Sequence, residues 1–375
     1  MTAARDDVLR DRKSIIVKLG SMVLAGPEGG IDQVIIDTLA EEMADLVQKG
    51  YRFVIVSSGA ILMGLREMGQ ATTPRAMKVK QALAAIGQSK LMHAYDEAFS
   101  THGIKVGQVL LTREGLDDRK RFVNSRNTLQ ALLRMGAIPV INENDSVAVE
   151  EIMFGDNDFL SSMVVNLTDA DLLVILTDTA GLYDRDPRLG EGRLIEMVEL
   201  VDEKILDAAG GPGDSGSGGM SSKVMAAKRT ARMGIPTVIA DGRTPGILTR
   251  ILNAEPAGTL FLPATEKLGS RKHWIAYSAG VSGTLVLDDG AVKAVVDGNK
   301  SLLPAGIKDV KGSFDQGGLV QCVDRSGREV ARGFTSFSAD HIRLIMGKHS
   351  EEIREVLGFF PGEEVIHRDD LVLKE

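Results

Sequence analysis

The sequence predicts an α/β protein: a three-layer αβα sandwich around a mainly parallel sheet, followed by a smaller, mostly β domain. Two observations support this prediction. Up to Pro263, short β-branched runs alternate with long helical patterns, as they do in βαβ units. After Pro263 the runs become short and alternating and are separated by Gly, Asp and Asn, which is typical of β structure. A chain of 375 residues is also long enough for two domains.

Six strands are expected in the larger region, each of them a short apolar run. They are Ser14–Leu19, Phe53–Ser57, Val106–Thr112, Ile138–Asn142, Leu172–Thr177 and Thr237–Ala240. The helical patterns between them are Asp32–Lys49, Arg75–Ser100, Arg119–Met135, Asp158–Thr168 and Ser222–Met233. The first of these helices begins at an Asp that can cap it and ends before Gly50. The charged N-terminus, MTAARDDVLRDRKS, is expected to be a solvated tail.

The smaller region contains four further alternating runs that we expect to be strands. They are Gly283–Leu287, Ala291–Val296, Leu319–Val323 and Glu329–Phe334. The polar segment after Pro263 has the composition of a linker. We therefore expect one domain at residues 8–265, a linker at 266–280 and a second domain at 281–375.

Composition excludes several classes of protein. The formal net charge is −8, which argues against a protein that mainly coats nucleic acid. The single cysteine, Cys322, excludes an internal disulfide framework and is expected to be a small buried hydrophobe. No run approaches the ~18 apolar residues of a membrane span, and the N-terminus has no apolar signal region. We expect a cytoplasmic protein.

Ligands of open α/β sheets bind outside the carboxyl ends of the strands, so these ends are the candidate site. Lys18 lies in an apolar strand end, where its ammonium is costly to bury without an anion. Ser58 lies in a tight turn after the second strand, whose N–H groups can receive a carboxylate or a phosphate. Thr177 and Asp178 end a further strand and precede a loop that is a candidate contact for a nucleotide.

Two acidic and amide clusters follow the fourth strand, Asn142–Asp145 and Gly155–Asp158. No basic residue separates them, so they repel each other unless a cation lies between them. An amino-acid ammonium or Mg²⁺ would serve, and the residues leave both open. The spacing of an EF-hand loop is absent.

A glycine-rich segment leads into a predicted helix. Its GPGDSG portion follows a helical pattern, which excludes a dinucleotide-binding strand-turn-helix, and no P-loop motif occurs. Residues Ser217–Lys223 instead provide glycines and a helix N-terminus for a phosphate chain. Lys223 opposes the helix dipole, so an anion is expected beside it. Two lysines, a phosphate loop and an acidic pocket together indicate phosphoryl transfer.

The motifs are those of a known family, and the chain resembles the glutamate 5-kinases over nearly its full length. Within it we read VKLGS at 17–21, VSSGA at 56–60, AAIGQ at 84–88, GQVLLT at 107–112, INENDSV at 141–147, GDND at 155–158, LTD and GLY within 176–183, GGMSSK at 218–223, SLLPAGI at 301–307 and HRDD at 367–370. The resemblance implies an amino-acid-kinase fold, a C-terminal PUA domain, and transfer of the γ-phosphoryl group of ATP to the side-chain carboxylate of L-glutamate, the first step of proline biosynthesis.

The resemblance also implies roles for individual residues. Lys18 and Lys223 would stabilise the transferring phosphoryl group, and Asp158 would orient both lysines. The residues implied to hold glutamate are Ser58, Asp145, Asp156 and Asn157. The residues implied to hold ATP are Lys18, Gly20, Ser21, Thr177, Asp178, Ser217, Gly218, Gly219, Met220, Ser221, Ser222 and Lys223. Mg²⁺ would accompany ATP with its protein ligands unassigned, proline would inhibit, and the chain would form a homo-oligomer.

Two alternatives stay open at this point. A kinase of the same fold could act on another small carboxylate, although the acidic pocket argues against an N-acylated one. The PUA domain could bind RNA, but residues 281–375 hold 12 basic and 16 acidic residues, a net charge of −4, without a basic stripe. One departure from the family pattern is Met153, where relatives often have a basic residue, and it puts a cationic contact at the substrate entrance in doubt.

Overall fold

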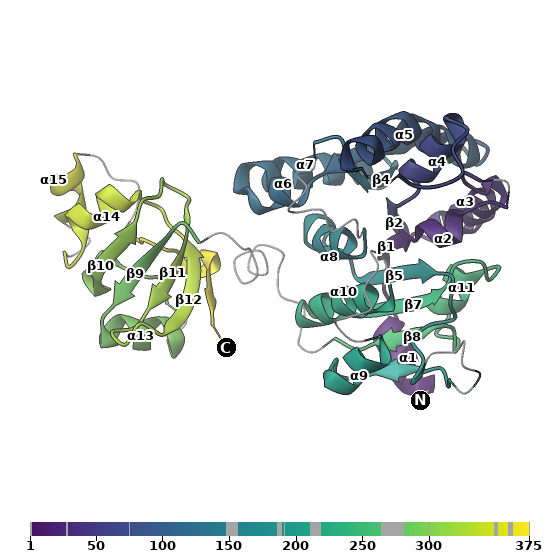
Figure 1. Ribbon diagram of the computed structural model, residues 1–375. Coiled ribbons are helices and arrows are strands. Elements are labelled where there is room, and N and C mark those ends of the chain that lie inside the picture. Colours follow the sequence, from purple (N-terminus) through teal and green to yellow (C-terminus); the bar gives the residue numbers. More distant parts are fainter. Residues whose placement is uncertain are drawn as a thin grey trace. The chain divides into compact units, whose positions relative to one another are not determined.

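The computed structural model describes residues 2–27, 29–74, 76–147, 157–185, 190, 192–210, 219–263, 281–298, 300–348, 352–358 and 363–374. The chain divides into two compact units, residues 1–267 and 268–375 (Figure 1). Each unit has a hydrophobic core of its own. The segment predicted as a linker, 266–280, lies outside the described residues.

A sheet of eight strands crosses the described part of unit 1, in the order β3-β4-β2-β1-β5-β7-β8-β6. Its strands are β1 (Ser14–Leu19), β2 (Arg52–Ser57), β3 (Val106–Leu111), β4 (Ile138–Glu143), β5 (Leu172–Thr177), β6 (Met197–Val198), β7 (Thr237–Asp241) and β8 (Thr259–Phe261). All neighbours pair in parallel except β7 and β8. The predicted sandwich with a mainly parallel sheet is confirmed, and β1 and β5 lie at its centre.

Helices cover both faces of this sheet (Figure 1). They are α1 (Thr2–Leu9), α2 (Ser21–Leu24), α3 (Gln33–Gln48), α4 (Ala60–Glu67), α5 (Met77–Ser100), α6 (Arg113–Asp117), α7 (Arg119–Arg134), α8 (Asn157–Thr168), α9 (Glu203–Ala208), α10 (Met220–Arg232) and α11 (Ile247–Leu252). On one face α2, α3, α5 and α11 contact the strands, and on the other α7, α8 and α10 do so. Asp32 caps α3 by accepting a hydrogen bond from the N–H of Val34, as its sequence position predicts.

Side chains alternate between the two faces of the sheet along β1, and this alternation places Lys18 on the face that α7, α8 and α10 contact. Ile15, Val17 and Leu19 belong to the core cluster that α3 and α5 complete. Because successive side chains of a strand point to opposite faces, Lys18 lies on the other side of the sheet, toward α8. Helix α8 contacts β1 directly, so a buried lysine amine and the start of α8 meet on that face.

Helices α4 and α5 approach each other unusually closely, and two glycines permit it. A Cβ atom at Gly64 would lie 2.0 Å from the carbonyl oxygen of Leu83, and one at Gly87 would lie 1.8 Å from that of Ala60. No side chain fits at either position, because both neighbours are backbone atoms. The contact brings the middle of α5 against the first turn of α4, which follows the end of β2.

Three predictions about elements are wrong. The N-terminal segment is not a solvated tail but helix α1, because Leu9 packs in the core and Arg5 donates hydrogen bonds to the carbonyl oxygens of Ala257 and Gly258. The sheet has two more strands than predicted, β6 and β8, since strands of two or three residues carry no readable periodicity. The run Ala291–Val296 is helical, because Asp288 caps it through the N–H of Ala291.

Unit 2 contains a five-stranded sheet in the order β10-β9-β11-β12-β13. Its elements are β9 (Gly283–Leu287), α13 (Asp289–Val296), β10 (Ile307–Gly312), β11 (Leu319–Val323), β12 (Glu329–Phe334), α14 (Ala339–Ile345), α15 (Ile353–Leu357) and β13 (Leu371–Leu373). Cys322 lies fully buried in its core, as predicted, and burial raises the pKa of its thiol to about 12. None of the described helices in either unit is long and apolar enough to span a membrane.

Candidate active site

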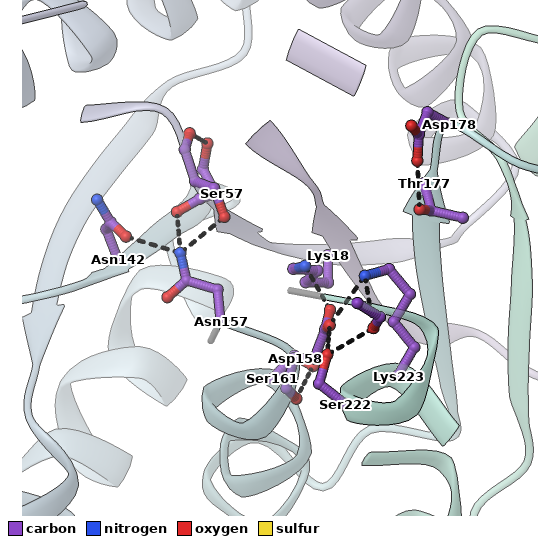
Figure 2. A network of polar contacts seen from close by, with 12 residues as sticks. Lys18, Ser57, Asn142, Asn157, Asp158, Ser161, Thr177, Asp178, Ser222 and Lys223 are labelled. Atoms are coloured by element: carbon purple, nitrogen blue, oxygen red, sulfur yellow. Dashed lines mark hydrogen bonds and ion pairs between the residues drawn. The ribbon is translucent and has the colours of Figure 1, made fainter. Parts of the chain in front are cut away.

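The candidate site lies along the edge of the sheet where the parallel strands end. Strands β1, β2, β4 and β5 end at Leu19, Ser57, Glu143 and Thr177. Because these strands run in parallel, their carboxyl ends face the same edge. Helix α8 begins at this edge with Asn157 and Asp158, and these two neighbours contact different groups (Figure 2).

Asp158 joins two buried lysines, and we call these three residues the lysine–aspartate cluster. Its carboxylate is fully buried and forms an ion pair through Oδ1 with Nζ of Lys18. Its other oxygen, Oδ2, lies 3.1 Å from Nζ of Lys223. Both lysine side chains are only 4% exposed. These three residues together carry one formal positive charge in a buried setting, and such a charge favours an anionic ligand.

The start of α10 completes the cluster. The hydroxyl of Ser222 lies 2.7 Å from Oδ2 of Asp158 and 2.8 Å from the carbonyl oxygen of Gly219. Gly219 is the N-cap of α10 and makes no side-chain cap, so no capping side chain satisfies the first N–H groups of this helix. Uncapped N–H groups and the helix dipole attract negative charge. Lys223 opposes that dipole, and Asp158 supplies the anion that its position predicts.

Asn157 is the centre of a second group, the amide cluster, which consists of Ser57, Ser58, Gln88, Asn142 and Asn157. Its Nδ2 lies 2.9 Å from the carbonyl oxygen of Ser57, 3.0 Å from Oγ of Ser58 and 3.0 Å from Oδ1 of Asn142. Asn142 in turn donates from Nδ2 to Oε1 of Gln88 across 2.8 Å. The cluster therefore connects the ends of β2 and β4 with α5 and α8.

Tyr95, on α5, contacts the end of β2 just before the turn that contains Ser58. Its hydroxyl lies 2.8 Å from Oγ of Ser57, and burial raises the pKa of the phenol above its ordinary value. Gly59 follows with φ of +107°, a conformation that favours glycine, and it is the N-cap of α4. The two features fix the position of Ser58 between β2 and α4.

Asp145 follows the end of β4 and is half-buried. Burial raises the pKa of its carboxyl above the ordinary value, because desolvation disfavours the charged form. No described residue forms an ion pair with Asp145. A cationic ligand would therefore stabilise its ionised form.

Thr177 and Asp178 lie on the β5 side of the edge (Figure 2). The hydroxyl of Thr177 lies 3.1 Å from Oδ1 of Asp178. The N–H of Gly20 donates to the carbonyl oxygen of Leu176 across 3.1 Å, which ties the turn after β1 to the end of β5. The hydroxyl of Thr177 and the turn at Gly20 and Ser21 thus belong to adjoining strand ends.

Comparison with known proteins decides the family. Residues 13–241 match the amino acid kinase family, and residues 283–357 match the PUA domain. The chain is 48% identical to the glutamate 5-kinase of Geobacter sp. (strain M21) over 98% of this chain and 100% of the relative. It is 47% identical to that of Syntrophotalea carbinolica over 99% of this chain and 100% of the relative.

The chain belongs to the glutamate 5-kinase family. The resemblance inferred from the motifs is thereby confirmed, together with the amino-acid-kinase fold and the PUA domain. The fold is also similar to that of carbamate kinase from Giardia lamblia, with a TM-score of 0.50 and 14% identity over 67% of this chain and 99% of that chain.

The residues that the family resemblance singles out fall into three groups in the structure. Lys18, Asp158, Ser222 and Lys223 meet in one cluster, Ser58 meets Asn157, and Thr177 meets Asp178. Met220 and Ser221 form the first turn of α10 beside Gly219. Asp156, Ser217 and Gly218 lie outside the described residues, as does Met153. The described residues include no group of three His, Cys, Asp or Glu side chains that could hold a metal ion.

Sequence reasoning missed one member of the amide cluster. Asn142 was predicted as part of the acidic and amide cluster Asn142–Asp145, but without a role of its own, whereas no role was predicted for Gln88, which lies in the motif AAIGQ. Gln88 carried no comparable signal, because its position against β4 depends on the close approach of α4 and α5.

Proposed function

We propose that this chain transfers the γ-phosphoryl group of ATP to the side-chain carboxylate of L-glutamate, giving L-glutamyl 5-phosphate for proline biosynthesis. One observation carries the proposal. Two buried lysine amines share a single carboxylate at the sheet edge, beside the uncapped N-terminus of α10. The family assignment supplies the choice of glutamate.

The reaction brings two anions together, and the lysine–aspartate cluster offsets their repulsion. An oxygen of the glutamate side-chain carboxylate attacks the γ-phosphorus, the bond from that phosphorus to the β,γ-bridging oxygen breaks, and ADP leaves with the electron pair. Lys18 and Lys223 neutralise charge on the transferring group. Asp158 holds both amines in place before the substrates arrive, so little reorganisation is needed.

Glutamate binds on the amide side of the edge in this proposal, through Ser58, Asp145 and Asn157, with Asp156 lining the same pocket. The half-buried Asp145 carboxylate, whose pKa burial raises, suits the ammonium group of glutamate. The same chemistry disfavours N-acetylglutamate, whose nitrogen carries no charge. The amide cluster supplies fixed dipoles for the rest of the amino acid.

ATP binds on the other side of Asp158. The turn at Gly20 and Ser21, the end of β5 at Thr177 and Asp178, and the segment Ser217–Lys223 are the proposed contacts. Mg²⁺ enters with the ATP phosphates as part of the substrate, since it retains several of its own waters and needs few protein ligands.

The test traps the product. Hydroxylamine converts an acyl phosphate into a hydroxamate, so the protein is incubated with Mg·ATP, L-glutamate and hydroxylamine. A hydroxamate that requires glutamate and disappears in Lys223→Ala supports the proposal. If hydroxamate forms only with L-aspartate or only with N-acetylglutamate, that acid is the substrate in place of glutamate. If a folded protein forms no hydroxamate with any of these acids, the proposed reaction is contradicted.

Three accompanying predictions remain part of the proposal. L-Proline inhibits the reaction, which adding it to the same assay tests. The chain forms a homo-oligomer, which sedimentation tests. The catalytic domain comprises residues 8–265, and the second domain, 281–375, contributes no residue to the reaction.

A further inference from the structure

Two polar atoms of the amide cluster are buried without a hydrogen-bond partner among the described residues. They are Oδ1 of Asn157, whose residue is only 9% exposed, and Nε2 of Gln88. A buried acceptor or donor left in this way destabilises the fold, so its orientation has to be enforced by its surroundings. The contacts around it show what enforces it.

Two backbone groups fix the amide orientations. The carbonyl oxygen of Ser57 can only accept, so the atom that Asn157 turns toward it must be the amino group, Nδ2. The N–H of Glu143 can only donate, and it lies 2.9 Å from Oδ1 of Asn142. Asn142 therefore offers its oxygen to Asn157 and its amino group to the opposite side.

Gln88 receives that amino group. Its Oε1 lies 2.8 Å from Nδ2 of Asn142. If the carboxamide of Gln88 were rotated by half a turn, its Nε2 would face the Nδ2 of Asn142, and two donors would oppose each other. Asn142 therefore also fixes the orientation of Gln88, which leaves Nε2 without a partner among the described residues. Gly87, the preceding residue, has no room for a Cβ against the backbone of α4, which holds this part of α5 in place.

We propose that Gln88 is a positioning residue for substrate recognition. Its Oε1 holds Asn142 in contact with Asn157, so that Asn157, whose orientation the backbone carbonyl of Ser57 sets, keeps its buried Oδ1 in place as an acceptor for an N–H of the bound amino acid's ammonium group. This inference rests on the proposed function, because it requires an ammonium-bearing substrate. It adds a residue on α5 that does not contact the substrate but supports the position of Asn157, which does.

The inference predicts a selective loss. Gln88→Met keeps the length of the side chain and removes the acceptor for Asn142, so Asn142 is held less firmly against Asn157 and the buried Oδ1 is placed less precisely. The KM for L-glutamate should rise roughly tenfold. The KM for ATP should stay within about twofold, because the lysine–aspartate cluster is unaffected. Gln48→Met, on the exposed end of α3, is the matched control.

Glutarate separates recognition of the ammonium group from the shape of the pocket. It has both carboxylates of glutamate and lacks the amino group, so its inhibition constant against glutamate should change by less than about twofold in Gln88→Met. Gln88→Glu, which still offers an oxygen to Nδ2 of Asn142, should keep the KM for glutamate within about threefold of the unchanged protein. Thermal melting of each variant confirms that it is folded.

The outcomes separate the two proposals. If the unchanged protein forms no glutamate-dependent hydroxamate, the proposed function fails and this inference fails with it. If the unchanged protein is active and Gln88→Met leaves the KM for glutamate unchanged, only the positioning role is overturned. The same holds if the KM for glutamate rises together with the inhibition constant of glutarate and the KM for ATP. A rise confined to glutamate, with recovery in Gln88→Glu, supports it.

Discussion

Asn157 and Asp158 are consecutive residues at the start of α8, yet their surroundings differ in one essential respect. Asp158 contacts Lys18, Lys223 and Ser222, so its charge is compensated within the protein. Asn157 is also buried, but its Oδ1 has no partner among the described residues. The half-buried Asp145 likewise has no described counter-charge. One side of the site is complete by itself, and the other is not.

The difference matches two tasks. Charges that stabilise a transition state act best when they are already in place, which the lysine–aspartate cluster achieves. Groups that recognise a small zwitterion gain selectivity when their hydrogen bonds form only with the correct ligand, because a wrong ligand leaves them unpaired. Substitutions on the two sides should therefore have different kinetic signatures.

The largest effect is expected on the charged side. Lys223→Ala should lower kcat about 10²- to 10³-fold while the KM for glutamate stays within a few-fold, since the amine is proposed to act on the transferring group. Steady-state kinetics measure both constants. Lys228→Ala, on the same helix, is the control and should be unchanged, and an equal loss in both variants would show that the effect is a general disturbance of α10.

On the recognition side, Asp145→Asn should act mainly on binding. In the proposed site this change removes the charge that would face the ammonium, so the KM for glutamate should rise by about 30-fold, with a much smaller change in kcat. The exposed Asp96→Asn is the matched control. A fall in kcat as large as that of Lys223→Ala, at unchanged KM, would remove the distinction between the two sides.

Asp145→Asn, which should weaken glutamate binding, should by contrast stabilise the fold, by a smaller amount. Burial raises the pKa of Asp145 above 3.8, so the ionised carboxylate destabilises the folded state at pH 7. Asp145→Asn should therefore melt at a higher temperature than the unchanged protein at pH 7. The gain should shrink as the pH falls through the raised pKa and vanish below the ordinary value, where both states bind the proton. Melting curves without glutamate, from pH 7 to acid, test this sign.

The smallest effect is expected from removing unit 2. The contacts of the two clusters given above all lie between residues 18 and 223. Deletion of residues 270–375 should change kcat and both KM values by less than about threefold. Circular dichroism checks that the shortened chain folds. If the shortened chain folds but is inactive, unit 2 is required for activity and the prediction is wrong.

Much of the fold could be read from the sequence, because strands of about six residues and capped helices have strong periodic signals. Strand β1 was predicted with its observed bounds, and α3 was predicted from Asp32 and Gly50. Predictions failed where tertiary contacts decide: α1 is held by Arg5 and Leu9, β8 is too short to show a period, and α13 has an alternating pattern that its cap overrides.

The candidate site, too, could be predicted from the sequence only in part. Motifs identified Lys18, Asp158 and Lys223 as members of one site, and the structure brings these three together. Asn142 was predicted only as part of a candidate cluster, and its contact with Gln88 could not be predicted, because a hydrogen bond between residues 54 positions apart leaves no trace in local patterns. The direction in which an amide points depends on backbone groups that only the fold supplies.

Helix α8 restricts how this protein can vary. Eleven of its twelve residues are buried, and the ring of the remaining one, Phe159, contacts the guanidinium groups of Arg113 and Arg229. The hydroxyls of Ser161, Ser162 and Thr168 bond to carbonyl oxygens of the same helix, so these three polar side chains are buried with their hydrogen bonds satisfied inside the helix. A larger or charged side chain fits almost nowhere along it. Sequence drift among descendants of this chain should therefore be slowest in these three turns, and new specificities should arise from the strand ends around them.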